Sequence, residues 1–364
     1  MKVLLLSCFT GEGHNSAARA IMAELTRRGI AHQLKDPTSF HGPRAERFVS
    51  SCYNGLIRHV PRAFGVIYRL GDWYDRTGLP SPIYHANATY ARALYDFIRQ
   101  EGFDRVICTH LYGMEAMTAI RQQLGGQIAT YGVLTDYTPI PFLCETVLDG
   151  YCIPHDALRE AMIARGAPAD RLHDTGIPVD PAFSQPISRQ DARARLNLPQ
   201  EQPIFLVMSG GIGGGDVAGL CRQLLKAGSA KIAVLTGHNQ VLRQKLSVLD
   251  PRILAIPFTR EVALYMKAAD VLLSKPGGLS STEAATAQVP LVHVGAIPGC
   301  ETANVKFFSR MGMSLAARNA EQAAALAQYL LDTPQAAEQM RQHQATMPRN
   351  AAAQIVDLVT SCGG

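Results

Sequence analysis

The sequence lacks several features that would assign it to a class at once. Its 364 residues contain no run of about 20 apolar residues, so we expect no membrane-spanning helix. The apolar start, Val3–Leu6, is too short for a signal peptide. None of the eight cysteines forms a C-x-x-C pair or a ligand spacing with histidine, which argues against a zinc site and a disulfide framework. We therefore expect a cytoplasmic protein with reduced thiols and no metal.

Charge is also sparse. Charged residues make up 18% of the chain, the net charge is +5 and the pI is near 8.8. This bias is too weak to indicate nucleic-acid binding, but it is compatible with an anionic substrate or membrane surface. Hydrophobic residues make up 47%, which supports packed cores and excludes a disordered chain. The length favours two domains.

Short apolar strands alternate with amphipathic helices along the chain. Lys2–Cys8 reads as a strand, residues 11–14 as a turn and Asn15–Arg28 as a helix. Further strands are expected at His32–Lys35, Arg105–Thr109, Ala129–Thr135, Gly150–Ile153, Pro203–Ser209, Lys231–Thr236, Ile253–Pro257, Val271–Ser274 and Pro290–Val294. This alternation is typical of an α/β protein with parallel sheets covered by helices on both faces.

The segment Gly176–Pro181 contains two prolines that disfavour both helix and sheet, and we interpret it as an interdomain linker. We expect two Rossmann-like doubly wound domains, residues 1–179 and 180–345, that face each other across a cleft. A C-terminal helix within residues 346–364 could pack back on the first domain. Ligands in such folds bind at the carboxyl ends of the strands, so chemistry is expected there.

The most informative segment is Ser274–Ala284. A strand ends, Gly277 and Gly278 permit close backbone approach, and a helix begins. The free N–H groups and positive dipole end of a helix N-terminus suit a diphosphate, and Glu283 could accept hydrogen bonds from ribose hydroxyls. However, Ser280-x-x-Glu283 is equally a capping box, in which the glutamate bonds back to the Ser280 N–H. The residues alone leave both interpretations open.

A glycine loop, Ser209–Asp216, also lies between an expected strand and helix. Such a loop can cradle phosphate, or it can be a tight turn. It lacks the Lys-Ser/Thr of a P-loop, which disfavours ATP hydrolysis.

His14 lies in the segment Thr10–Ser16, at the first strand–helix turn. With a near-neutral pKa it could take a proton from an acceptor hydroxyl, although a lone histidine is more often structural. Thr135-Asp136 ends another expected strand on the same side. Asp136 could orient His14, supply the base itself, or serve as a turn or cap residue.

Arginines and aromatic residues interleave between Arg44 and Asp75: Arg44, Arg47, Arg58, Arg62 and Arg69 alternate with Phe48, Tyr53, Phe64, Tyr68 and Trp73. On helices this composition suits anionic lipid headgroups, with the rings at the interface. Nucleic acid could use the same chemistry, and a solvated helix face over a local core is a third interpretation.

Taken together, these segments resemble the family of monogalactosyldiacylglycerol synthases and processive diacylglycerol glucosyltransferases, within glycosyltransferase family 28. The resemblance covers nearly the whole chain. It rests on the opening Ser7–Ala18, the Thr135-Asp136 turn, the link Gly176–Val179, the donor segment Ser274–Glu283 and the segment Pro298–Asn304.

The resemblance implies a GT-B fold, a UDP-sugar donor and inversion at the anomeric carbon, with no metal and no cofactor. It assigns donor binding to Gly13, Ser209, Gly210, Gly211, Phe258, Ser274, Lys275, Gly277, Gly278, Leu279, Ser280, Ser281, Glu283, Pro298, Gly299, Glu301 and Asn304. Within that set it places Glu283 at the ribose, Phe258 over the uracil, and Glu301 and Asn304 near the donor sugar.

The resemblance also makes His14 the first candidate for the catalytic base, with Asp136 and Glu12 as further catalytic candidates. The lipid acceptor and an anionic membrane, at the inner face of the cell membrane, would meet Arg58, Arg62, Phe64 and Tyr68. Nucleic acid is not expected as a partner.

The sequence departs from the family pattern at three places. Cys300 stands where the family usually has glutamine, which leaves the donor sugar open. Glu12 stands where the plant lipid enzymes have glycine. Tyr137-Thr138-Pro139 follows Asp136 without the His-Pro-x-Trp of close lipid synthases, which leaves the acceptor open, although the family favours diacylglycerol. A UDP-sugar epimerase and a non-catalytic UDP-sugar sensor are the alternative functions.

Overall fold

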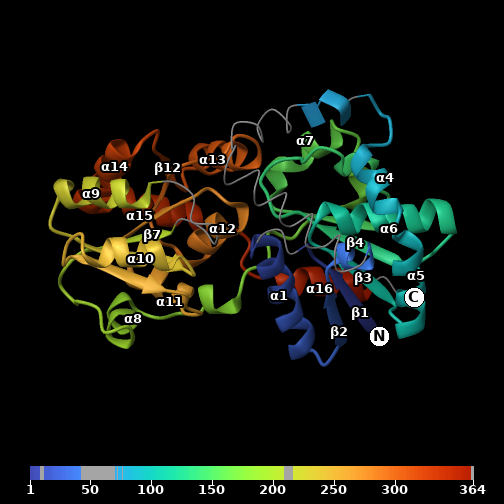
Figure 1. The fold of residues 1–364 in the computed structure, drawn as a ribbon, viewed down its shortest axis with the longest axis horizontal. Helices are drawn as coiled ribbons and strands as arrows, with labels where there is room; N and C mark the ends of the chain where they lie inside the picture. Colours follow the sequence, from blue (N-terminus) through green and yellow to red (C-terminus); the bar gives the residue numbers. More distant parts are fainter. Residues whose placement is uncertain (9–11, 42–69, 72, 76, 209–215, 362–364) are drawn as a thin grey trace. The chain divides into compact units, whose positions relative to one another are not determined.

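The computed structural model describes residues 1–8, 12–41, 70–71, 73–75, 77–208 and 216–361 (Figure 1). The chain divides into two compact units. The first contains Met1–Asp180, Pro298–Cys300 and the chain from Pro348 onward, and the second contains Pro181–Ile297 and Glu301–Met347. The chain passes from the first unit to the second within the proline-containing segment that follows Gly176.

The first unit is built on one parallel sheet of six strands in the order β2-β1-β3-β4-β5-β6. The strands are β1 (Lys2–Leu6), β2 (Ala31–Lys35), β3 (Arg105–Cys108), β4 (Ala129–Val133), β5 (Gly150–Ile153) and β6 (Leu172–Asp174). Its helices are α1 (Glu12–Arg27), α4 (Pro82–Ala88), α5 (Ala91–Glu101), α6 (Leu111–Leu124), α7 (Arg159–Ile163) and α16 (Ala351–Ser361). Strand order reverses direction between β1 and β3, so this junction is the topological switch point at which such sheets bind ligands.

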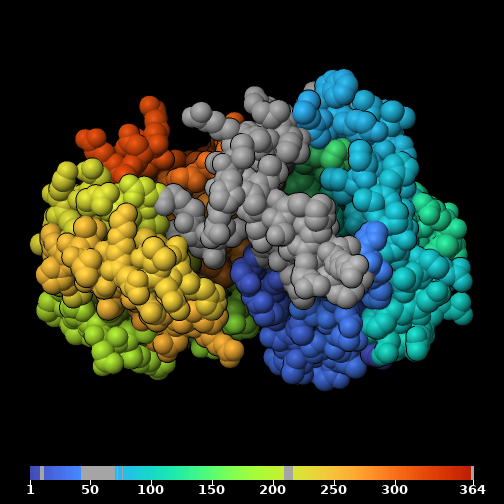
Figure 2. All heavy atoms as spheres, in the orientation of Figure 1, coloured from blue at the N-terminus to red at the C-terminus, as the bar shows by residue number. Residues whose placement is uncertain are grey.

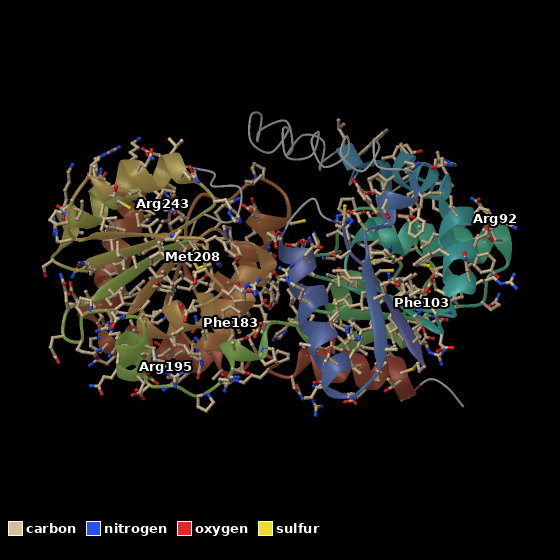
Figure 3. The ribbon with its side chains drawn as sticks, turned by 60° about the horizontal axis from the view of Figure 1, so that its bottom comes forward. Arg92, Phe103, Phe183, Arg195, Met208 and Arg243 are labelled. Atoms are coloured by element: carbon tan, nitrogen blue, oxygen red, sulfur yellow. The ribbon has the colours of Figure 1, made fainter. Side chains whose placement is uncertain are left out.

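The period of two along β1 produces two cores, one on each face of the sheet. Val3 and Leu5 pack with Ile21 of α1 and Ile355 of α16. Leu4 and Leu6 pack on the opposite face in a cluster supplied by α5 and α6. Phe103, labelled in Figure 3, belongs to this second cluster. Burial on both faces explains the continuous apolar run that identified this strand in the sequence.

The last helix, α16, packs beside α1 within the first unit (Figure 1). Its residues Ile355, Val356 and Val359 are fully buried in the core that also contains Val3 and Leu5. Arg28, just after α1, forms an ion pair with Asp357 and donates to the Ala353 carbonyl at 3.2 Å. Because the Asp357 carboxylate is largely exposed, the apolar contacts hold this helix more than the ion pair does.

The second unit contains another parallel sheet of six strands, in the order β12-β11-β10-β7-β8-β9. The strands are β7 (Ile204–Met208), β8 (Lys231–Gly237), β9 (Ile253–Pro257), β10 (Val271–Ser274), β11 (Leu291–His293) and β12 (Leu315–Ala316). Its helices are α8 (Arg189–Arg195), α9 (Val217–Ala227), α10 (Gln240–Ser247), α11 (Val262–Ala268), α12 (Gly278–Ala287), α13 (Cys300–Arg310), α14 (Ala320–Asp332) and α15 (Pro334–Gln344). The switch point lies between β7, which ends at Met208 (Figure 3), and β10.

The strands and the fold class expected from the sequence are confirmed, with differences at two short edge strands and at the start of α1. The short edge strands β6 and β12 were not predicted, because two or three residues carry too little alternation to show a period. Helix α1 begins at Glu12, so the turn predicted at residues 11–14 is wrong for Glu12, Gly13 and His14. Glu12 in its first turn complements the helix dipole. No helix in the described part of the chain is long and apolar enough to span a membrane.

Three carboxyl groups affect one another where α6 meets the loop before β5: Glu115 is buried, and Glu145 and Asp75 are half-buried. Glu115 is fully buried, and neither of its side-chain oxygens has a hydrogen-bond partner. Glu145 accepts the Ser81 N–H at 2.8 Å, and Asp75 accepts the Phe142 N–H at 3.1 Å. Burial, with the nearby charges of Glu145 and Asp75, raises the pKa of Glu115 to about 10. Glu115 is therefore protonated at neutral pH.

We expect Glu115→Gln to stabilise the protein at alkaline pH. The folded pKa lies above the unfolded one, so the folded state holds a proton that the unfolded state releases, and the free energy of unfolding falls as pH rises from about 4.5 to about 10. Glutamine removes this titration, and its amide can donate to the Glu145 carboxylate. The expected gain at pH 9 is about 1–3 kcal/mol, the usual cost of an unsatisfied buried polar group. Thermal denaturation of both proteins at pH 6 and pH 9 measures it.

The matched control is Glu160→Gln on the exposed face of α7. This variant should leave both melting temperatures unchanged. If Glu115→Gln lowers the melting temperature at pH 9, Glu115 is charged and paired in the folded protein, and our assignment of its protonation state is wrong.

Candidate active site

The first unit places His14 at its topological switch point. His14 lies in the first turn of α1, which follows β1, while Thr109 follows β3 directly and Thr135 lies two residues beyond the end of β4. His14 Nδ1 is 2.8 Å from the Thr109 carbonyl oxygen and 2.9 Å from Thr135 Oγ1. Three segments that are far apart in the sequence thus meet at one ring nitrogen, because their strands are parallel and end at the same edge.

These contacts determine which nitrogen of His14 carries the proton. A carbonyl oxygen can only accept a hydrogen bond, so Nδ1–H donates to Thr109, with the Thr135 hydroxyl as a second acceptor. The lone pair of neutral His14 is therefore on Nε2. Burial lowers the pKa of His14, partly offset by its bond to the Thr109 carbonyl. A neutral imidazole with a fixed tautomer can act as a general base at Nε2.

Local packing holds the start of α1 in place. The Ser7 hydroxyl, just after β1, donates to Asn15 Oδ1 at 2.7 Å, and both side chains are buried. Asn15 is the residue after His14, so this bond anchors the helix turn that carries the imidazole. A buried hydrogen bond of this kind is costly to leave unmade, which favours one orientation of the turn.

The other two catalytic candidates are placed differently. The Glu12 carboxylate is 73% exposed and pairs with Arg19 at 3.0 Å on the outer face of α1. Asp136 is half-buried and directly follows Thr135, whose hydroxyl contacts His14. The exposure of Glu12 therefore favours His14 over Glu12 as the base, and Asp136 stays a candidate.

In the second unit, β10 leads through Lys275 and Pro276 into α12. The N-cap of α12 is Gly277, and no side chain caps it. The first backbone bond of the helix runs from Ser281 N–H to the Gly277 carbonyl at 3.0 Å. The N–H groups of Gly278, Leu279 and Ser280 thus have no acceptor within the helix, and they lie at its positive end.

Two side chains support this helix start. Lys275 Nζ lies 3.0 Å from Glu301 Oε1, and Glu301 Oε2 accepts the Ile297 N–H at 2.7 Å. Asn304 is fully buried and donates its side-chain amide to the Pro276 carbonyl at 2.9 Å. The lysine charge and the first turn of α12 together form a place where an anion is stabilised.

An aromatic pair follows the neighbouring strands of this sheet. His238 lies just after β8 and Phe258 just after β9, and their rings stack with centroids 4.6 Å apart at 12°. Phe258 is 57% exposed. A flat exposed ring at the carboxyl edge of a sheet can stack against a planar ligand group. In the described residues, no group of three His, Cys, Asp or Glu side chains is arranged to hold a metal ion.

Both halves of the chain match models of known families. Residues 14–179 match monogalactosyldiacylglycerol (MGDG) synthase, and residues 217–359 match the glycosyltransferase family 28 C-terminal domain. The second half of the chain thus carries the C-terminal domain of glycosyltransferase family 28. The resemblance seen in the sequence is thereby confirmed.

Individual relatives of this chain agree. A processive diacylglycerol beta-glucosyltransferase from Bacillus cytotoxicus is 24% identical over 376 residues, which cover 98% of this chain and 93% of the relative. A processive diacylglycerol beta-glucosyltransferase from Bacillus cereus is 24% identical over 347 residues, which cover 91% of this chain and 85% of the relative.

Solved structures show the same fold at low sequence identity. MurG from Acinetobacter baumannii is 20% identical, with a TM-score of 0.63 and coverage of 99% of each chain. UDP-GlcNAc 2-epimerase from Neisseria meningitidis, bound to UDP-GlcNAc, is 14% identical, with a TM-score of 0.63 over 99% of this chain and 100% of the epimerase. The GT-B architecture expected from the sequence is confirmed. The similarity of fold is compatible with the epimerase alternative. The two relatives from Bacillus described above are glucosyltransferases by name.

The structure shows the surroundings of three residues that the family resemblance assigned to donor binding, and that assignment stays a prediction. Ser281 is buried, and its hydroxyl bonds to His293 Nε2 at 3.0 Å, so it faces β11 and not the helix N-terminus. Burial lowers the pKa of His293 to about 3, so the imidazole stays neutral. Ser274 is also buried, within the sheet. Asn304 is fully buried, and its side-chain amide bonds to the Pro276 carbonyl before the start of α12.

The capping-box interpretation of Ser280 and Glu283 is also wrong. Because α12 begins at Gly278, Ser280 is the third residue of the helix and cannot be its N-cap. Glu283 therefore does not close a capping box with Ser280, and its role at the ribose stays a prediction. Pro298 and Gly299 form the turn before α13, and Gly13 lies in the first turn of α1.

Some predicted residues lie outside the described part of the chain: Ser209, Gly210, Gly211, Arg58, Arg62, Phe64 and Tyr68. Conversely, sequence reasoning missed Thr109, His110 and His238. Each follows a strand at the carboxyl edge of its sheet, the position that had drawn attention to His14. The signal was present, but strand order was needed to bring Thr109 to His14.

Proposed function

We propose that this chain is an inverting glycosyltransferase that moves a hexose or N-acetylhexosamine from a UDP-sugar to a hydroxyl group of a lipid, such as diacylglycerol, without a metal ion. The observation that carries the proposal is His14, whose tautomer is fixed so that Nε2 can accept a proton. The match to the family 28 C-terminal domain and the names of the relatives from Bacillus support the substrate class.

In the proposed reaction, His14 Nε2 takes the proton of the acceptor hydroxyl. The acceptor oxygen then bonds to the anomeric carbon on the face opposite the diphosphate, and the bond between that carbon and the phosphate oxygen breaks with its electron pair. UDP leaves, and the sugar configuration is inverted.

The diphosphate gains one negative charge as the bond to the anomeric carbon breaks, in addition to the charges that it already carries. The N–H groups of Gly278, Leu279 and Ser280, the positive end of α12 and the Lys275 ammonium would stabilise it. Binding a diphosphate would draw Lys275 from Glu301, which frees the Glu301 carboxylate to accept hydrogen bonds from sugar hydroxyls. Preorganised donors of this kind supply the stabilisation for which other transferases use a divalent cation.

A screen of donors against acceptors tests the proposal. The purified protein is incubated in EDTA with each UDP-sugar and with total lipid extract, and the products are read by mass spectrometry. We expect one UDP-sugar to yield a lipid heavier by one sugar, together with free UDP. Conversion of UDP-GlcNAc to UDP-ManNAc without acceptor would indicate an epimerase. Binding of a UDP-sugar without any product would indicate a sensor.

We also propose that the chain attaches peripherally to the cytoplasmic face of the cell membrane. Leu70, Trp73 and Leu79 lie within or next to the basic and aromatic stretch and are 59%, 67% and 60% exposed. Their segment (light blue) lies on the surface of the first unit in Figure 2. Exposed apolar side chains beside arginines can insert among anionic headgroups.

The double variant Trp73→Ser, Leu79→Ser should lower binding to anionic vesicles. We expect a drop of about tenfold or more in a flotation assay, since each large apolar side chain contributes about 1.5–3 kcal/mol when buried. The matched control is Val241→Ser, Val248→Ser on and beside α10, where both valines are exposed by more than three quarters. Equal flotation of the two double variants would contradict the assignment of this surface.

A further inference from the structure

A second histidine, His110, packs directly against the candidate base. It follows Thr109 and is the N-cap of α6, where its Nδ1 accepts the Tyr112 N–H at 3.2 Å. Its ring centroid is 4.6 Å from that of His14, with the planes at 85°. The ring of Tyr112 also contacts His110, at 4.5 Å and 75°.

The position of His110 is set by close packing beneath it. Gly113, in the first turn of α6, has no room for a side chain: a Cβ there would lie 2.9 Å from Leu6 Cβ and 3.2 Å from Cys108 Sγ. The helix therefore begins in direct contact with the ends of β1 and β3. This contact brings its N-cap side chain against the ring that extends from α1.

The charge state of His110 follows from its contacts. Because Nδ1 accepts a hydrogen bond, neutral His110 carries its proton on Nε2. Burial and the neighbouring His14 hold the pKa of His110 well below its ordinary value. The titratable groups that face His110 are His14 from α1 and Tyr112 from its own helix. Burial, and then the nearby charges of Cys8 and Asp36, raise the pKa of Tyr112. His110 thus stays neutral and adds no positive charge beside the base.

The two bonds at Nδ1 hold one edge of the His14 ring but do not by themselves prevent rotation about that edge. We propose that His110 is a positioning residue for the reaction, which packs edge-to-face against His14, keeps water from its ring and leaves Nε2 directed at the acceptor hydroxyl. This inference rests on the proposed function, since it concerns the same proton transfer. It assigns no contact with substrate to His110.

Two variants separate the ring of His110 from its capping role. His110→Asn keeps an N-cap acceptor for the Tyr112 N–H but removes the ring, whereas His110→Phe keeps a ring and removes the acceptor. We expect His110→Asn to lower kcat for sugar transfer by about 10- to 100-fold, the cost of a misplaced catalytic group, with KM for the UDP-sugar unchanged.

In His110→Asn, water would also reach His14 and raise its pKa. The acidic limb of the plot of kcat/KM against pH should therefore move to higher pH. His110→Phe should keep the limb near its wild-type position.

An NMR titration of the His14 Cε1 proton, assigned with a His14 variant, provides a readout that needs no substrate. A higher His14 pKa in His110→Asn than in the wild type supports the inference. If His110→Asn leaves both the His14 pKa and kcat unchanged, the inference is wrong. It is also wrong if His110→Phe loses as much activity as His110→Asn while the two proteins have equal melting temperatures. If the wild type transfers no sugar although the pKa shift is present, the proposed function fails while the packing of His110 on His14 stands.

Discussion

His14→Ala is expected to lower kcat for sugar transfer by about 10²–10⁴-fold, the usual contribution of a general base. Without the imidazole, the acceptor hydroxyl must lose its proton to water as it attacks. Affinity for UDP should stay nearly the same, because the elements assigned to the diphosphate belong to the second unit. Initial rates with saturating substrates measure the first effect, and calorimetric titration of UDP measures the second.

A matched control and a pH profile make this test specific. His32→Ala removes a histidine near the amino-terminal end of β2, at the opposite edge of the same sheet, and should leave kcat unchanged. Because burial lowers the pKa of His14, the activity of the wild type should fall only below the ordinary histidine pKa of 6.5, as pH drops through that lowered pKa. Full activity of His14→Ala would refute the role of His14 as the base.

Glu283→Ala is expected to weaken UDP binding by about 10- to 100-fold, the worth of hydrogen bonds to a charged acceptor. Glu283 lies in the second turn of α12, half-buried, and its carboxylate would accept hydrogen bonds from the ribose hydroxyls. Once substrate concentrations are saturating, kcat should change little, because the ribose does not react.

A ligand lacking one hydroxyl sharpens the test of Glu283. The wild type should bind UDP more tightly than 2′-deoxy-UDP, and Glu283→Ala should bind the two alike. The control Glu321→Ala removes an exposed glutamate from α14 in the same unit and should behave as the wild type. If Glu283→Ala keeps the preference for UDP, the ribose is recognised elsewhere.

The sequence allowed the architecture to be predicted because buried parallel strands are continuous apolar runs and their helices are amphipathic. It also placed His14 at a strand end. What it could not show was the partner of His14: Thr109 is 95 positions away, and only the strand order β2-β1-β3 brings it within 2.8 Å. The tautomer of His14 could therefore be assigned only once the order of the strands was known.

The side-chain directions in the donor segment could not be predicted for a different physical reason. A serine beside two glycines is typical of a phosphate loop, but whether its hydroxyl meets a ligand depends on the helical position it occupies. Since α12 starts at Gly278, Ser281 turns toward β11 and bonds to His293, whereas Ser280 stays in the first turn. A shift of the helix start by one or two residues rotates every later side chain by about 100° per residue. Helix starts are the boundaries that sequence patterns define least well.

The most direct test of the account is a calorimetric titration of the wild-type protein in EDTA with UDP and then with UMP. The account predicts that UDP binds without a divalent cation and that UMP, which lacks the second phosphate, binds at least about tenfold more weakly, since charge-assisted hydrogen bonds are worth about 1.5–3 kcal/mol. Equal affinity for UDP and UMP, no affinity for UDP, or binding that appears only after magnesium is added would contradict it.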